Sequence, residues 1–267
     1  MKICFLWFFA QAPDVFDNWR DGLRAAIEII GKEHKVDWII GKYFPEDKYD
    51  AIIFWDDSNS EFFQRIDQYH GKKALCLTTD PHNFDNLRKL DAVYCESEPI
   101  YEAVRQQGIR AIKAFGTDTD YFTPDEGEKN IEYFYPATFS PWKRQADIAY
   151  LGDKLTCIGT VQPDGTEELA ECLKNGVKVE EGYFPVSKIR DYYRRSQHVI
   201  IPAIHGSERT VLEAMSCGIK PEVINEHNVR TKSYIKELEE SGLSPREFVI
   251  QNYSAKKYAE QILKGIQ

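Results

Sequence analysis

The chain has 267 residues and a mass of 31.0 kDa, which is enough for one large or two small domains with substantial cores. Its composition, 42% hydrophobic and 29% charged, excludes a disordered, collagen-like or coiled-coil protein. The net charge of −9 argues against a broad basic face, so we expect no nucleic-acid partner. A small anionic ligand held by a few local cations remains compatible with this charge.

The apolar segments are too short for a membrane span, because none reaches the roughly 18 residues required. The run 3–9 precedes Ala10-Gln11-Ala12, which resembles a signal-peptide cleavage site, but its shortness and single preceding charge favour a buried first strand. The six cysteines form no C-x-x-C pair, which indicates reduced core residues of a cytoplasmic protein. The six histidines are equally scattered, so the sequence gives no support for a metal site.

Short apolar runs alternate with longer amphipathic stretches, a pattern typical of βα units and parallel sheets. In the first half, the predicted strands are 3–9, 36–40, 51–55, 74–78, 92–95 and 111–115. Apolar residues at spacings of three and four predict a helix over 16–30. In the second half, the predicted strands are 133–137, 155–158, 177–179, 199–202 and 222–224. Helices are expected near 166–174, 187–196 and 207–217.

Residues 118–129 are polar, contain proline and glycine and lack periodicity, so we place a domain boundary there. The expected fold class is α/β, with two Rossmann-like parallel-sheet domains that face each other across a cleft. The predicted domains are 1–122 and 123–250, with a C-terminal helix in 251–267 that packs back on the first domain. Such sheets bind ligands where their strands end, which draws attention to Asp56 and Asp57 among others.

The densest chemical signal lies in residues 199–218. A strand ends at Pro202, a loop with Gly206 follows and a helix begins near Ser207, so the helix N-terminus forms an anion site. Glu213, roughly one turn further on, is suited to accept hydrogen bonds from the hydroxyls of a ribose. A purely structural interpretation also fits, in which Thr210 and Glu213 form a capping box and Gly218 ends the helix.

This stretch resembles the signature of the retaining, nucleotide-sugar-dependent glycosyltransferases of the GT-B architecture, the glycosyltransferase group 1 or sucrose-phosphate synthase-like family. That signature has two glutamates eight residues apart, and 213–218, Glu-Ala-Met-Ser-Cys-Gly, is similar to its end. Three further segments match in the same order: 92–97 with 114–124, 139–144, and 182–184 with 198–202. The resemblance extends from about Ala74 to the C-terminus.

The resemblance implies metal-independent transfer of a sugar, with retention, from a UDP- or GDP-sugar to a hydroxyl of a glycan, lipid or small-molecule acceptor. The nucleotide sugar is then a co-substrate, and no cofactor is expected. The first domain is expected on the acceptor side and the second on the nucleotide-sugar side. The residues implied to bind the donor diphosphate and ribose are Lys143, Arg144, Gly206, Ser207, Glu208, Arg209, Thr210 and Glu213. Asp80 and His82 lie where the family commonly has a cleft histidine, so the resemblance makes them, with His205, the candidate catalytic residues.

Three positions depart from the family pattern. The first glutamate of the pair is His205, the arginine usually found five residues before the lysine is Thr138, and the glycine pair after the first strand is absent from 10–13. We interpret His205 as a hydrogen-bonding partner of a sugar hydroxyl; the alternative is a relic without that role. Lys143 and Arg144 could also be a solvated pair, and Asp80 could cap a turn. The alternative function is a catalytically inactive GT-B protein that binds nucleotide or glycan.

Overall fold

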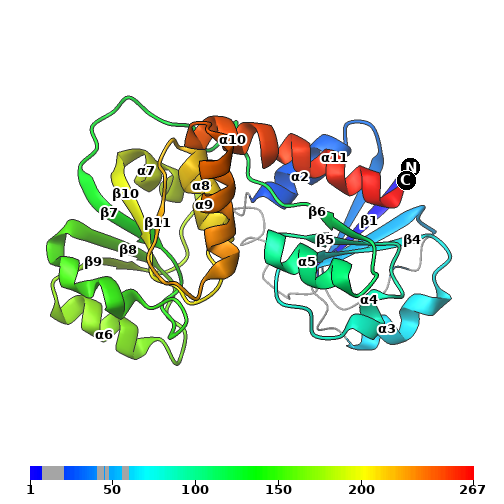
Figure 1. Ribbon diagram of the computed structural model, residues 1–267, viewed down its shortest axis with the longest axis horizontal. Helices are drawn as coiled ribbons and strands as arrows, with labels where there is room; N and C mark the ends of the chain where they lie inside the picture. Colours follow the sequence, from blue (N-terminus) through cyan, green and yellow to red (C-terminus); the bar gives the residue numbers. More distant parts are fainter. Residues whose placement is uncertain (8–20, 41–44, 46–47, 56–59) are drawn as a thin grey trace. The chain divides into compact units, whose positions relative to one another are not determined.

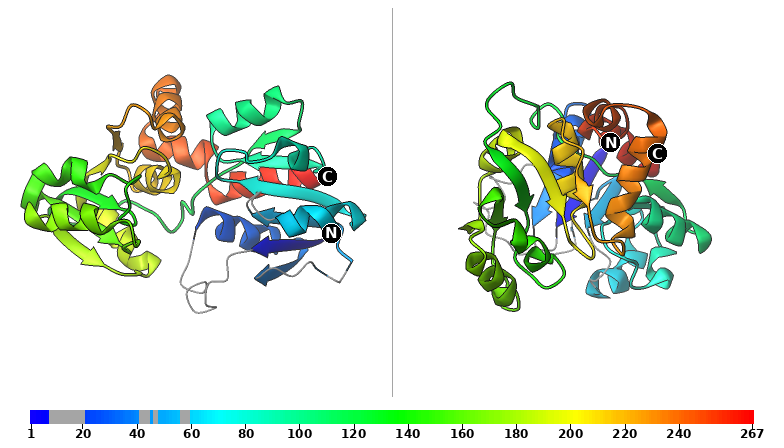
Figure 2. Two further views of the ribbon diagram at one scale, coloured as in Figure 1. Left: turned by 90° about the horizontal axis from the view of Figure 1, so that it is seen from below. Right: turned by 60° about the vertical axis from the view of Figure 1, so that its left-hand side comes forward.

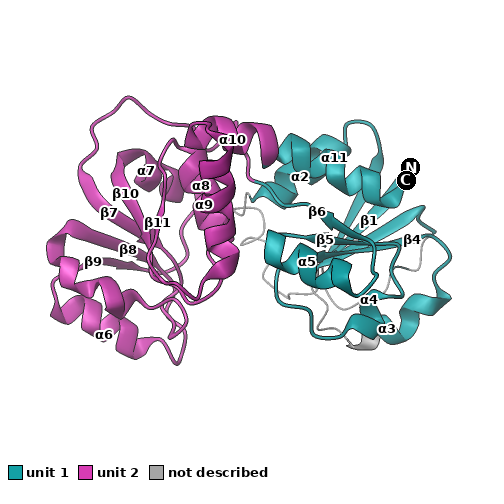
Figure 3. Cartoon of the chain, viewed as in Figure 1, with its two compact units in different colours: residues 1–116, 253–267 teal, residues 117–252 magenta. Residues whose placement is uncertain are grey.

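The computed structural model describes residues 1–7, 21–40, 45, 48–55 and 60–267, which divide into two compact units (Figure 3). Unit 1 comprises Met1–Gly116 with Tyr253–Gln267, and unit 2 comprises Thr117–Asn252. Each unit contains one sheet of parallel strands with helices packed against it (Figures 1 and 2). The α/β prediction with two Rossmann-like domains is therefore confirmed. Predicted strand residues 8 and 9, helix residues 16–20, Asp56 and Asp57 lie outside the described residues.

Unit 1 has a six-stranded sheet in the order β2-β1-β3-β4-β5-β6. Its strands are β1 (Lys2–Trp7), β2 (Lys35–Ile40), β3 (Ala51–Trp55), β4 (Lys72–Leu77), β5 (Ala92–Cys95) and β6 (Ala111–Lys113). Its helices are α2 (Gly22–Ile30), α3 (Ser60–Arg65), η1 (Ile66–Gln68), α4 (Phe84–Leu87), α5 (Glu98–Gln106) and α11 (Ala255–Ile266). All six predicted strands are present, with ends that shift by a few residues.

β1 is apolar after Lys2 because both of its faces are covered. Ile3 and Phe5 belong to one core cluster, whereas Cys4 and Leu6 belong to the other, as the alternation of side chains along a strand requires. Helices α2 and α11 contribute to the first cluster, and α3, α4 and α5 to the second. The strand interpretation of the N-terminal apolar run is therefore confirmed over Lys2–Trp7.

The C-terminal helix α11 lies beside α2 in unit 1 (Figure 1). The hydroxyl of Tyr94 donates a hydrogen bond to the carbonyl of Ile262 at 2.5 Å. A Cβ atom at Gly265 would lie 2.3 Å from that same hydroxyl oxygen, so only glycine permits this close approach.

The chain passes into unit 2 after Gly116, not after Phe122 as the sequence predicts. Phe122 is fully buried in unit 2, where its carbonyl accepts hydrogen bonds from Ser216 Oγ at 2.6 Å and from Arg246 at 3.0 Å. These bonds attach the polar segment around Phe122 to α8 and α10. They explain why unit 2 begins earlier in the sequence than predicted. The second division, between Asn252 and Tyr253, also lies slightly later than predicted.

Unit 2 has a five-stranded sheet in the order β11-β10-β7-β8-β9. Its strands are β7 (Ile131–Pro136), β8 (Leu155–Gly159), β9 (Lys178–Glu181), β10 (Ser196–Ile201) and β11 (Glu222–Val223). Its helices are η2 (Gln145–Lys154), α6 (Thr166–Lys174), α7 (Val186–Arg195), α8 (Glu208–Ser216), α9 (Val229–Ser241) and α10 (Pro245–Asn252). The five strands and three helices that the sequence predicts here are all present.

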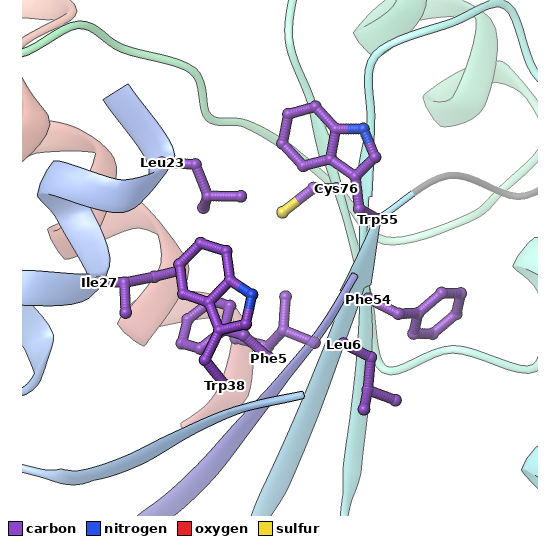
Figure 4. A pocket seen from close by; sticks show the side chains of 9 residues that line it. Phe5, Leu6, Leu23, Ile27, Trp38, Phe54, Trp55 and Cys76 are labelled. Atoms are coloured by element: carbon purple, nitrogen blue, oxygen red, sulfur yellow. The ribbon is translucent and has the colours of Figure 1, made fainter. Parts of the chain in front are cut away.

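A small apolar cavity lies in unit 1 between α2 and the strands beneath it (Figure 4). Its volume is about 10 Å³, and its lining includes Trp38, Trp55 and Cys76. A cavity of this size holds at most about one water molecule, so we interpret it as imperfect packing. None of the helices that the structure describes has the length and apolar character to cross a bilayer.

Candidate active site

The candidate site lies in unit 2, at the edge of the five-stranded sheet where its parallel strands end. β10 ends at Ile201, residues 202–207 form a loop and α8 begins at Glu208. Gly206 and Ser207 both have left-handed backbone conformations, with φ angles of 74° and 82°. This conformation is unfavourable for serine, so the surrounding structure must hold the loop in place.

The first turn of α9 holds this loop. Asn228 Nδ2 donates to the carbonyls of Ala203 and Gly206, both at 3.1 Å. Thr231 Oγ1 donates to the same Gly206 carbonyl at 2.8 Å. Asn228 also caps α9, since its side chain accepts from the backbone N–H of Thr231 at 3.2 Å. The sequence analysis missed these residues, although an asparagine directly before a helical run is a helix-start signal.

Lys143 reaches this loop from the segment after β7. Its Nζ donates to Ser207 Oγ at 3.2 Å, and the hydroxyl of Tyr135 lies 3.2 Å from the same oxygen. Burial lowers the pKa of the Lys143 ammonium group; nearby Glu208 opposes this effect, and Arg209 adds to it. Within the described part of the chain, Lys143 forms no ion pair with a carboxylate. Its remaining N–H donors are therefore suited to an anionic ligand.

A buried ion pair lies beside Lys143. Arg230 Nε is 3.0 Å from Glu208 Oε1, and the two side chains are only 11% and 5% exposed. A carboxylate in the first turn of α8 is favourable because it faces the positive end of the helix dipole. Arg230 balances that carboxylate, which leaves Lys143 as the cation available to a ligand. No local sequence signal connects Arg230 with Glu208.

Glu213 lies further along α8 and is almost fully buried. The hydroxyl of Tyr193 donates to its Oε2 at 3.1 Å, and Arg209 Nε lies 3.2 Å from its Oε1. Burial raises the pKa of Tyr193 well above its ordinary value, so the hydroxyl stays a donor. These two contacts hold the Glu213 carboxylate in a defined position.

The capping-box interpretation of α8 is wrong at its N-terminus and correct at its C-terminus. The helix begins at Glu208 with Ser207 as the N-cap, so Thr210 lies inside it and faces the carbonyl of Pro136 at 3.5 Å. Gly218 has a φ angle of 84° just after the helix, and its N–H donates to Met215 at 2.9 Å. Glu213 is therefore not part of a capping pair.

Arg144 and Thr138 point to other partners. Arg144 donates to Asp147 from Nε at 2.9 Å and from a terminal nitrogen at 3.0 Å, which raises the pKa of its guanidinium group. The hydroxyl of Thr138 lies 3.1 Å from that of Thr160. The structure thus brings Lys143 to the loop before α8, while the guanidinium of Arg144 binds Asp147.

His205 is exposed at the start of the same loop. Its ring stacks on that of Trp142, with centroids 6.1 Å apart and an angle of 14° between the planes. Among the residues with described positions, no three His, Cys, Asp or Glu side chains gather as metal ligands would. The region combines a half-buried lysine, the N-terminus of α8 and an adjacent aromatic pair.

Asp80 and His82 belong to unit 1, in the segment between β4 and α4, and both are exposed. The cap of α4 is Asn83, whose side chain accepts from the backbone N–H groups of Asp85 at 2.9 Å and Asn86 at 3.2 Å. The interpretation of Asp80 as the capping residue of this turn is therefore wrong. The structure leaves both side chains at the surface after a strand end, as the sequence predicts.

No model of a protein family and no curated protein matches this chain. Solved structures do match its fold. The trehalose-6-phosphate synthase OtsA aligns with a TM-score of 0.70, 9% identity and coverage of 100% of this chain and 99% of OtsA. AviGT4, a glycosyltransferase involved in avilamycin A biosynthesis, aligns with a TM-score of 0.66, 12% identity and coverage of 99% and 96%.

The DNA-modifying enzyme β-glucosyltransferase, solved with and without its substrate uridine diphosphoglucose, aligns with a TM-score of 0.60, 14% identity and full coverage of both chains. Some matching structures are longer: this chain spans 54% of the length of TarM. These similarities establish that the chain has the fold of the GT-B glycosyltransferases.

Proposed function

We propose that this protein is a nucleotide-sugar-dependent glycosyltransferase that moves a sugar from a UDP- or GDP-sugar to an acceptor hydroxyl. The observation that carries this proposal is the half-buried Lys143, which contacts Ser207 at the start of α8 and, among described residues, pairs with no carboxylate. The fold supports the proposal, because structures that share it act on or bind nucleotide sugars, as with uridine diphosphoglucose.

The chemistry of the reaction explains why a cation is needed here. Transfer breaks the bond between the anomeric carbon and a phosphate oxygen, so negative charge grows on the leaving diphosphate. Lys143 and the backbone N–H groups of Gly206–Thr210 are suited to stabilise that charge, and the positive end of α8 adds to them. These groups supply the stabilisation without a metal ion.

We assign Glu213 to the ribose of the donor. Tyr193 and Arg209 fix the carboxylate in place, and a carboxylate is a strong acceptor for the hydroxyls of a ribose. The ligand then extends from the ribose at Glu213 to the diphosphate at Lys143.

We further propose that transfer retains the configuration of the donor sugar. The acceptor hydroxyl attacks on the side of the leaving diphosphate, which takes its proton, so no strong protein base is required. Asp80 and His82 are the proposed catalytic residues of unit 1, and the acceptor is a glycan, a lipid or a small molecule. All six cysteines are buried and unbridged, which supports a reducing cytoplasmic environment.

The direct test is incubation with a panel of UDP- and GDP-sugars, with and without simple acceptors, and measurement of released UDP or GDP. Release from one donor, stimulated by an acceptor, is the expected result. Nuclear magnetic resonance of the product then gives the configuration of the new bond; an inverted anomeric centre would refute retention alone.

A protein that binds nucleotide or glycan without turnover is the second candidate. One observation favours it: His205 stands where the resemblance has a glutamate, beside the anion site. The same panel separates the two functions, since a binding protein gives saturable heat in calorimetry but releases no nucleoside diphosphate.

A further inference from the structure

Two loops at the candidate site bring two rings together, the indole of Trp142 and the imidazole of His205. Trp142 follows β7 and His205 follows β10, and their planes are nearly parallel at 14°. The backbone fixes this arrangement, because the N–H of Ile204 donates to the carbonyl of Trp142 at 2.9 Å. The pair therefore has a defined geometry before any ligand arrives.

The polar atoms of this ring pair remain available. In the part of the chain that the structure describes, neither the indole N–H of Trp142 nor a ring nitrogen of His205 has a hydrogen-bond partner. Trp142 is half-buried and His205 exposed. An apolar surface with a few unused polar groups at its edge is typical of sites for small polar ligands.

The ring pair is continuous with the anion site. Trp142 directly precedes Lys143, and His205 directly precedes Gly206, while Lys143 Nζ and Ser207 Oγ are 3.2 Å apart. Glu213 lies further along α8, about 8 Å from Glu208 at 1.5 Å per residue, whereas His205 precedes the helix. A nucleotide sugar has its diphosphate between its ribose and its sugar, so this order places the sugar beside the rings.

We propose that Trp142 is a sugar-binding residue of the donor site, whose indole packs against the C–H groups of the donor pyranose. This inference rests on the proposed function of the same site. His205 holds the indole by stacking, and its ring nitrogens with the indole N–H bond the sugar hydroxyls. The nucleobase, the other flat group of the donor, binds beyond the ribose at the far end.

The test compares binding of free UDP and GDP with binding of UDP-glucose and GDP-mannose by calorimetry. Trp142→Ala should weaken the preferred nucleotide sugar about tenfold, the size of one aromatic contact, and leave the free diphosphate within about twofold. Trp142→Phe keeps a flat apolar ring and should restore most of the difference. His205→Ala, at an exposed position, should give a smaller loss with the same selectivity.

Other outcomes overturn the inference. Equal losses of affinity for UDP and UDP-glucose in a folded variant mean that the indole contacts the base or only shapes the loop. That result rejects the sugar-binding role of Trp142 but leaves the proposed function intact. Unchanged affinities in both Trp142→Ala and His205→Ala also reject the role of the indole. If Trp142→Ala does not fold, His205→Ala is measured instead. A larger loss of affinity for the nucleotide sugar than for the free diphosphate supports the inference, and equal losses reject it. A wild-type protein that binds none of the four ligands overturns both proposals.

Discussion

Both edges of the five-stranded sheet carry charged side chains, but the charges are paired differently at each edge. At the edge where the strands begin, a hollow of about 630 Å³ is lined by residues of β7, β8, β9 and α7. There Lys154 lies 3.1 Å from Glu132, and Glu180 accepts hydrogen bonds from Lys188 and Tyr192. At the edge where the strands end, Lys143 faces a serine hydroxyl.

The pairing of the charges is a better guide to the candidate active site than the volume of the hollow. Exposed opposite charges that pair with each other have little energy left for a ligand. A half-buried cation without a carboxylate partner among described residues has already lost much of its water, so an anion gains more by binding it. The comparison predicts that substitutions at the two edges have unequal consequences.

The largest expected effect comes from removing the two lysines one at a time. Lys143→Ala should lower turnover roughly ten- to a thousandfold, because the charge on the leaving diphosphate loses its cation. Affinity for the free nucleoside should be nearly unchanged. Lys154→Ala, the matched control, should leave turnover within about twofold, because this lysine pairs with Glu132 at the surface. Steady-state kinetics measures turnover in both variants. Equal losses of turnover would contradict the proposed difference between the two edges.

The next effect concerns Glu213. Glu213→Gln should weaken nucleotide binding by about 1–3 kcal/mol, since a charged acceptor for the ribose is lost. Tyr193→Phe removes only the hydroxyl that holds this carboxylate, so we expect a smaller loss of affinity. Calorimetry and thermal melting are measured together. If both variants lower the melting temperature and neither changes nucleotide affinity, Glu213 has a structural role only.

Two glycines with the same backbone conformation provide a third comparison. Gly206→Ala and Gly176→Ala should each destabilise the fold by about 1–2 kcal/mol, because both φ angles are left-handed, 74° and 78°. Only at Gly206 would the new Cβ lie 2.6 Å from Lys143 Nζ, whereas nothing lies within 4 Å at Gly176. Nucleotide affinity should therefore fall only for Gly206→Ala. An equal fall in both would indicate a general effect of stability.

The smallest expected effect is the uptake of part of a proton when a nucleotide binds. Burial lowers the pKa of Lys143 below its ordinary 10.5, with Glu208 and Arg209 as the charged groups nearest to it. Between the lowered pKa and 10.5 the folded protein binds fewer protons than the unfolded chain, so the cost of burying this charge declines as pH rises through that window. A bound diphosphate favours the charged form and raises the pKa again.

Nucleotide binding in this alkaline window should therefore take up a proton. Calorimetry in two buffers with different ionisation enthalpies measures the uptake, and Lys143→Met should abolish it. The same uptake in Lys143→Met would assign the proton to another group.

The sequence alone predicted the elements well where hydrophobic periodicity was strong. The strand at β10 and the helix α6 follow from local patterns, because burial of both faces of a strand, or of one face of a helix, dictates the residue types. Lys143, Gly206, Ser207 and Glu213 became candidates because they lie in short segments that resemble the glycosyltransferase signature. The predicted start of α8 near Ser207 agrees with its observed start at Glu208. Only the alternative capping box at Thr210 was wrong, since nothing in the sequence marks Ser207 as a left-handed N-cap.

The tertiary structure decided which distant side chains meet. The sheet order puts β10 next to β7, so the loops that follow these strands lie together and bring Lys143 to Ser207 and Trp142 to His205. Tyr193 reaches Glu213, and Arg230 reaches Glu208, across shorter separations of 20 and 22 residues. Strand order and side-chain burial depend on the packing of the whole unit, so no local pattern of residues encodes these pairs.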